Sequence, residues 1–493
     1  MAGLKSLAKD TAIYGVSSIV GRFLNYLLVP LYTAKIAASS GGYGVITNIY
    51  AYTALLLVVL TYGMETAFFR FANKEGVDAR RVYSTALYSV AATSLLFIAL
   101  VVAFIGPVSG FLGYADHPAY VWTMAVTVAI DAFQCIPFAY LRFRRKPIKF
   151  AALKLLFIVL NIALNLTVFV VLPMCVDGSG STAFGALFSS PDVGWAFYIN
   201  LFCTAMITLF FYRELSGFRH GFDRRLLRQM LAYGWPILVL GIAGILNQTA
   251  DKILFPYIYG GDDAHAQLGI YGAASKIAMI MAMITQAFRY AYEPFVFGKA
   301  REGDSRATYA RAMGCFVAFT LLAFLLVTGY IDILKYIIGR DYWPGLSVVP
   351  IVMAAEIMMG VYFNLSFWYK LIDRTIWGAV FSGAGCLVLV AVNVLFVPRY
   401  GYTACAWGGF AGYGTAMLLS YVVGQRQYPI RYPLRTIGLY TATAAALFAA
   451  MTLLRGCLPA ALSIAANTVF VALFAVVVAR NEHLVNIIKA KTT

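Results

Sequence analysis

Long apolar stretches separated by short polar connections run along the whole chain. About fourteen of them reach or exceed the ~20 residues that an α-helix needs to cross ~30 Å of hydrocarbon. Apolar runs of this length predict an all-α polytopic membrane protein. The predicted spans are residues 11–36, 44–69, 83–106, 120–141, 150–173, 194–212, 230–257, 269–297, 312–331, 345–369, 376–397, 402–424, 436–454 and 460–479.

The composition is that of a membrane protein. Of the 493 residues, 61% are hydrophobic and 12% are charged, whereas soluble domains are about half apolar and a quarter charged. The first ten residues lead directly into a span that is longer than the apolar region of a signal peptide. We therefore expect the first helix to remain as an uncleaved anchor.

The net charge of +17 is explained by its distribution. Lysine and arginine gather in alternate connections, whereas the opposite connections 107–119, 174–193 and 258–268 contain neither residue. Basic residues accumulate on the cytoplasmic side of membrane proteins. The pattern predicts that both termini are cytoplasmic, and it gives no indication of nucleic-acid binding.

Two halves of the chain resemble each other. Tyr43 opens the second span and Glu65 follows 22 positions later, while Tyr271 and Glu293 repeat this step in the eighth span. We predict two six-helix bundles around a central cavity, plus two C-terminal helices. Parallel repeats of this kind place a substrate site between the halves, near the membrane midplane. The predicted domains are an N-terminal lobe at 1–213, a cytoplasmic linker at 214–229, a C-terminal lobe at 230–424, and two additional helices with a cytoplasmic tail at 425–493.

Charged residues near the centre of the predicted spans are the best candidates for a binding site, because charge at that depth is costly. Arg22 and Asp131 each lie about eleven residues into a span, and Glu356 has the same depth in the span that matches that of Asp131. Asn25 lies one turn from Arg22. Two interpretations stay open for Arg22. It binds an anionic substrate in a wet cavity, or it only pairs with Asp131.

Other charges within the spans have weaker signals. Glu356 is a candidate for ion coupling or a neutral, hydrogen-bonded acid, because burial favours the protonated form of a carboxyl group. Asp131 and Asp251 are further candidates for ion coupling. Arg289, a candidate substrate ligand, lies four residues before Glu293 and can also pair with it along the helix.

A polar face runs along the fifth predicted span. Lys154, Asn161 and Asn165 share it, and amides at such positions commonly pack against neighbouring helices. We favour packing over ligand contact for this face.

No set of residues with the spacing of a catalytic or metal site occurs in the sequence. The seven cysteines contain no CxxC pair, and the four histidines lack metal-ligand spacing. P-loop, GxSxG and HExxH motifs are also absent from the sequence. We predict a transporter rather than an enzyme, with no cofactor and no metal.

Several segments resemble bacterial polysaccharide-export proteins. They are LAKDTAIYGVSSIVGRFLNYLLVPLYT, YGVITNIYAYTALLLVVLTYGMETAFFRFANKE, AIDAFQCIPFAYLRFRRKPIKFAALKLLFIVLNIALNL and VPRYGYTACAWGG. The sequence is similar to the oligosaccharidyl-lipid (Wzx-like) flippases of the multidrug/oligosaccharidyl-lipid/polysaccharide superfamily. The resemblance implies two bundles that face each other across a V-shaped cavity.

The resemblance also implies a function. Similar proteins move undecaprenyl-diphosphate-linked oligosaccharides across the bacterial cytoplasmic membrane by alternating access, for surface polysaccharides such as the O-antigen of lipopolysaccharide. The implied partners are the lipid-linked oligosaccharide, membrane lipids and a polysaccharide polymerase. Two alternatives stay open: an ion-coupled multidrug antiporter of the same superfamily, and a lipid II flippase.

The first prediction tests Arg22. If Arg22 binds the substrate, Arg22→Ala abolishes surface polysaccharide at normal protein abundance, and lipid-linked repeat units accumulate inside the cell. Full export by this variant contradicts a substrate role. A double variant that neutralises both Arg22 and Asp131 separates the two interpretations, because restored export indicates a pair that is only structural.

Overall fold

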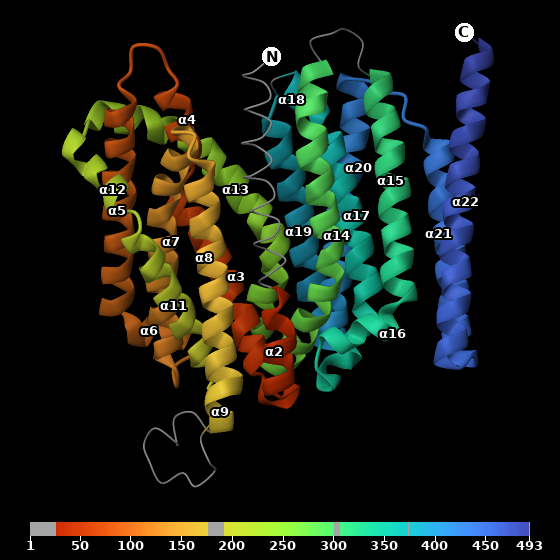
Figure 1. Ribbon diagram of the computed structural model, residues 1–493, viewed down its shortest axis with the longest axis horizontal. Coiled ribbons are helices and arrows are strands. Elements are labelled where there is room, and N and C mark those ends of the chain that lie inside the picture. Colours follow the sequence, from red (N-terminus) through yellow and green to blue (C-terminus); the bar gives the residue numbers. More distant parts are fainter. Residues whose placement is uncertain (1–25, 176–191, 300–305, 373, 493) are drawn as a thin grey trace. The chain divides into compact units, whose positions relative to one another are not determined.

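The computed structural model describes residues 26–175, 192–299, 306–372 and 374–492, with side chains except at 290–299 and 482–492 (Figure 1). These residues form helices and connections, with no strand among them. Contacts divide the chain into two compact units. The first unit is Met1–Tyr257 with Gly261–Gly269, and the second is Ile258–Gly260 with Ile270–Thr493. The predicted division into two six-helix lobes and an appendix stays a prediction.

The helices of the first unit pack around α7, the most buried of its apolar helices, which contacts α3, α5, α8 and α11 (Figure 1). The described elements up to the end of α13 are α2 (Leu28–Lys35), the 3₁₀ turn η1 (Ala38–Ser40), α3 (Gly42–Thr61), α4 (Met64–Ala72), α5 (Ala79–Ala103), α6 (Ile105–Phe111), α7 (Pro118–Phe143), α8 (Pro147–Leu166), the π-helical turn η2 (Thr167–Val171), α9 (Leu172–Cys175), α11 (Gly194–Leu209), α12 (Tyr212–Leu215), the 3₁₀ turn η3 (Ser216–His220) and α13 (Arg224–Tyr259).

A break between α3 and α4 lets α13 cross closely. Tyr62 and Gly63 adopt left-handed backbone conformations, with φ of 31° and 70°. A Cβ atom on Gly63 would lie 2.8 Å from the carbonyl oxygen of Gly234 in α13. Glycine is needed at Gly63 for the conformation and for this backbone contact.

The second unit contains the remaining helices and is built largely around α17, α19 and α20. Its described elements are α14 (Ala264–Lys299), whose residues up to Gly269 belong to the first unit, α15 (Arg306–Gly329), α16 (Ile331–Leu334), the 3₁₀ turns η4 (Lys335–Ile337) and η5 (Arg340–Val348), α17 (Val349–Leu365), α18 (Phe367–Leu371), α19 (Ile376–Tyr400), α20 (Tyr402–Gln427), α21 (Leu434–Cys457) and α22 (Ala460–Thr492). The last two helices pack on α15, where Asn467 Nδ2 donates a hydrogen bond to the Gly329 carbonyl at 2.7 Å.

The all-α polytopic class is confirmed. Among the described residues, eleven helices are long and apolar enough to cross a membrane, or twelve if the bent pair Gly194–Leu209 and Tyr212–His220 is one span. Two of the fourteen predicted spans are not among them. Most of span 11–36 lies outside the described residues, and α20 is long but less apolar. Because α20 packs against both α17 and α19, these helices cover part of its surface, and that part can carry more small and polar residues.

Small residues set the distance between α19 and α20. A Cβ atom on Gly385 would lie 2.7 Å from the carbonyl oxygen of Gly412, and one on Gly412 would lie 2.8 Å from that of Gly385. The two backbones therefore touch, as they do at small-residue crossings in membrane bundles. By contrast, Gly383 on the same helix has open space where a Cβ would be.

The second prediction compares these two glycines. Gly385→Val should lower the melting temperature of the purified protein by about 5 °C or more, because the added side chain forces the helices apart. Gly383→Val is the matched control, with the same change on the same helix and no predicted clash. Equal melting temperatures for the two variants in detergent would contradict the proposed role of the crossing.

Candidate functional site

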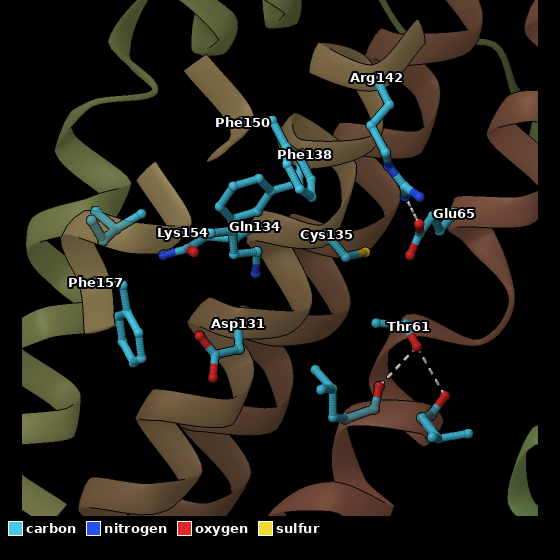
Figure 2. A pocket seen from close by; sticks show the side chains of 13 residues that line it. Thr61, Glu65, Asp131, Gln134, Cys135, Phe138, Arg142, Phe150, Lys154 and Phe157 are labelled. Carbon is cyan, nitrogen blue, oxygen red and sulfur yellow. Dashed lines mark hydrogen bonds and ion pairs between the residues drawn. The ribbon is translucent and has the colours of Figure 1, made fainter. Parts of the chain in front are cut away.

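A cavity of about 500 Å³ lies within the first unit, between α3, α4, α7, α8 and α11 (Figure 2). Its walls combine apolar side chains with two acids and two bases. The lining residues are Leu57, Val58, Thr61, Glu65, Asp131, Gln134, Cys135, Phe138, Arg142, Phe150, Lys154, Phe157 and Ile207. The elements that carry them belong to candidate membrane spans, in which Asp131 and Lys154 lie away from the ends and Glu65 and Arg142 lie near the ends.

Helix α7 supplies the polar wall of the cavity. Its contributing residues recur every three or four positions, which places them on one face of the helix. The face carries Asp131, Gln134, Cys135, Phe138 and Arg142. Asp131 and Arg142 are eleven positions apart, so the charged face extends for about 16 Å along α7. The helix begins with Pro118 in its first turn, where a missing backbone N–H costs little.

Hydrogen bonds from α11 fix the deeper part of this wall. Thr204 Oγ1 donates to Asp131 Oδ1 at 3.3 Å. The buried Gln134 amide donates to the Thr204 carbonyl and to Thr208 Oγ1, each at 2.8 Å. The carboxylate of Asp131 thus accepts a hydrogen bond from a neutral hydroxyl, that of Thr204. The Gln134 amide N–H groups bind α11.

Lys154 of α8 brings a positive charge to the same cavity. Its Nζ atom lies 4.1 Å from the ring centroid of Phe138, a cation–π distance. The side chain is exposed, and among the described residues it makes no ion pair within 4 Å. Figure 2 shows the side chains of Lys154, Gln134 and Phe157 near one another. A cavity that presents an ammonium group in this way can accept an anion.

The other two charges neutralise each other. Arg142 of α7 forms an ion pair with Glu65 of α4, drawn as a dashed line in Figure 2. The guanidinium carbon of Arg142 also lies 5.0 Å from the ring centroid of Phe69. This ion pair links α4 to the C-terminal end of α7 and forms part of the cavity wall there.

The structure brings together residues that the sequence did not connect. Asp131, a predicted site residue, shares the cavity with Lys154, which we had assigned to a packing face, and with Arg142, which directly follows the predicted span 120–141. The turn between α7 and α8 contains a signal that finds Lys154. Counting back from the end of α7 and forward from Pro147 places Phe138 and Lys154 at similar levels in an antiparallel pair. The rest of the polar face packs as we favoured, since Asn165 accepts a hydrogen bond from Tyr32 at 2.7 Å.

The other predicted site residues have different surroundings. Arg22 and Asn25 lie outside the described residues. Asp251 is buried on α13 and pairs with its neighbour Lys252, whose Nζ lies 3.0 Å from Asp251 Oδ2.

Glu356 and Arg289 belong to the second unit, on α17 and α14. Glu356 is half-buried, and the Arg289 guanidinium carbon lies 5.0 Å from the ring centroid of Phe363.

Residues 39–344 match the sequence profile of a family described as polysaccharide biosynthesis proteins. The match covers more than half of the 493 residues. The chain belongs to this family. No curated protein matches the chain.

Solved structures of transporters share the fold of this family member. An inward-facing multidrug resistance MATE family transporter of the MOP superfamily is 14% identical, with a TM-score of 0.65 over 82% of this chain and 93% of that one. The lipid II flippase MurJ, in an inward closed conformation, is 12% identical, with a TM-score of 0.69 over 94% and 98%. The MATE multidrug transporter DinF-BH is 16% identical, with a TM-score of 0.59 over 85% and 95%. At these identities the similarity establishes the fold.

The third prediction tests whether water fills the cavity. Cys135 lines it, whereas Cys203 of α11 is fully buried. In variants that keep only one of these cysteines, a small maleimide should modify Cys135 at least ten times faster than Cys203, because the reaction needs a hydrated thiolate. Equal rates in native membranes would show that the cavity is closed to water.

Proposed function

We propose that this protein is a flippase that moves an undecaprenyl-diphosphate-linked oligosaccharide across the bacterial cytoplasmic membrane for surface polysaccharide synthesis. The observation that carries the proposal is Lys154, an exposed lysine that lines a cavity of the first unit and forms no ion pair within 4 Å among the described residues. Membership of a polysaccharide biosynthesis family and a fold shared with transporters support it.

The chemistry of such a substrate fits the cavity. A diphosphate is anionic, and a charge-assisted hydrogen bond from an ammonium or guanidinium group is the strongest contact a side chain can offer it. Lys154 supplies that contact, and Arg22 is a second candidate. Because Asp131 accepts a hydrogen bond from Thr204 and forms no ion pair within 4 Å with Lys154, the lysine can turn towards a ligand without breaking a close ion pair.

Apolar and aromatic surfaces complete the site. Phe138, Phe150 and Phe157 line the cavity beside the charged groups, and flat rings suit the apolar faces of sugars. Transport needs no catalytic base, only a polar passage and two alternating states. In this proposal the two predicted six-helix lobes expose the site first to the cytoplasm, where both termini lie, and then to the outer side. A polysaccharide polymerase is the proposed recipient of the transported unit.

A second candidate function, an ion-coupled multidrug antiporter, is favoured by the acid in the cavity and by the fold shared with multidrug transporters. An antiporter for cationic drugs would depend on Asp131, with Glu356 and Asp251 as further coupling sites, and not on Lys154. A lipid II flippase is a third candidate with the same requirement for a cationic contact.

The fourth prediction distinguishes these functions. Lys154→Ala should lower surface polysaccharide at least tenfold in the native host while lipid-linked repeat units accumulate, because the phosphate loses its cation; Lys154→Arg should retain export. Lys146→Ala, at an exposed position just before the same helix, is the control. Protein abundance in the membrane is measured for every variant.

Three outcomes separate the candidates. Normal export by Lys154→Ala contradicts the proposed role of the lysine. Drug resistance that is lost in Asp131→Asn but kept in Lys154→Ala favours the antiporter. Rescue of a host that lacks its lipid II flippase favours the third candidate.

A further inference from the structure

The segment that follows α11 is a rigid, strongly basic surface of the first unit. The chain bends by 62° between Gly194–Leu209 and Tyr212–His220, and then enters α13. We call residues 212–228 the basic shelf. It carries Arg213, Arg219, Arg224, Arg225 and Arg228, and all five side chains are exposed.

Buried contacts fix the inner side of the shelf. Glu214 is buried, and its Oε2 atom accepts a hydrogen bond from Lys149 Nζ of α8 at 2.7 Å. The Tyr83 hydroxyl of α5 donates to the Glu214 carbonyl at 3.1 Å. A Cβ atom on Gly217 would lie 2.2 Å from the Tyr83 ring, so the backbone lies flat on that ring.

A second set of contacts extends this attachment to the start of α13. The Phe218 and Tyr88 rings pack edge to face at 4.7 Å, and the Tyr88 hydroxyl donates to the Phe218 carbonyl at 3.2 Å. Asp223 caps α13 by accepting hydrogen bonds from the backbone N–H groups of Arg225 and Leu226. The bond from Leu226 is the main cause of a lowered pKa for Asp223. The shelf is therefore a folded part of the unit rather than a loose linker.

The outer side of the shelf combines cations with aromatic rings. Tyr212 is 63% exposed and Phe222 is 47% exposed, and both stand among the arginines. Within 212–228 the acids are Glu214, which is buried in its pair with Lys149, and Asp223, which caps α13 and lies 3.8 Å from Arg81. The arginines of the shelf have no ion pair within 4 Å among the described residues.

We infer that the basic shelf binds the headgroups of anionic phospholipids in the membrane leaflet at the end of α11. Three observations support a lipid rather than a protein partner. The shelf begins at a 62° bend directly after the apolar helix α11. Its exposed Tyr212 is of a residue type enriched at membrane interfaces, and its five exposed arginines carry the charge that attracts such a segment to anionic lipid. Only one part of this inference rests on the proposed function. That part is the choice of the cytoplasmic leaflet, because the proposed function places the shelf on the cytoplasmic side.

The fifth prediction measures this binding in lipid nanodiscs. The full-length protein should have a higher melting temperature in discs that contain phosphatidylglycerol than in discs of phosphatidylcholine alone. The triple variant Arg219→Gln, Arg224→Gln and Arg225→Gln should lose most of that difference. It should also retain at least tenfold less phosphatidylglycerol in native mass spectrometry. Both effects should weaken as salt is raised.

A charge-matched control makes the test specific. Arg426, Arg431 and Arg435 are exposed around the connection between α20 and α21 of the second unit, and changing all three to glutamine removes the same charge. If both triple variants lose lipid equally, the effect is one of net charge and the inference is wrong. In nanodiscs of phosphatidylcholine alone, the shelf variant and the unmodified protein should have equal melting temperatures, which would confirm that the variant is folded.

The result is separate from the proposed function. A shelf variant that keeps lipid binding overturns the inference whether or not the protein transports a glycan. Labelling of a single cysteine at the exposed Ser216 with an impermeant reagent identifies the leaflet. Labelling from outside intact cells would overturn the cytoplasmic placement and leave lipid binding to be judged by the nanodiscs.

Discussion

A charged side chain within a bilayer must be paired or hydrated, and this constraint organises the first unit. Charged residues on one face of α7 meet this requirement in two ways. At one end, Arg142 is paired with Glu65, and at the other, Asp131 is held by a hydroxyl and faces a cavity that also contains Lys154. An intramembrane charge is costly to keep. The charges that are not paired are therefore the ones whose presence calls for a ligand or water.

Close helix packing surrounds this polar interior. Apolar burial drives little association between helices in lipid, so backbone contact and interhelical hydrogen bonds carry more of the stability. Backbone contact occurs in the second unit, where Gly385 meets Gly412. An interhelical hydrogen bond occurs in the first unit, where the Gln134 amide donates to α11. A cavity can persist in such a bundle because the helices that form its walls are fixed by contacts with neighbouring helices.

Periodicity and length were enough to predict the all-α polytopic class, because the cost of unsatisfied backbone groups leaves few alternatives in a membrane. Depth along each span was enough to select Asp131 as a residue of interest. Depth within a single span could not show that Lys154 shares its cavity, since that also requires pairing α7 and α8 as antiparallel neighbours across their turn. Our predicted spans also included 402–424 with the others, although α20 is less apolar; its contacts with α17 and α19, which account for that composition, are a tertiary property.

The break at Tyr62 and Gly63 has a mechanical consequence. Gly63 meets Gly234 backbone to backbone, so this point has no side chain that could change rotamer to absorb a displacement. Packed side chains let helices slide in small steps, whereas a bare backbone contact resists sliding and permits rotation. The crossing of α13 with the break therefore fixes how closely the two backbones approach at this point, and any side chain added to Gly63 or Gly234 would force them apart.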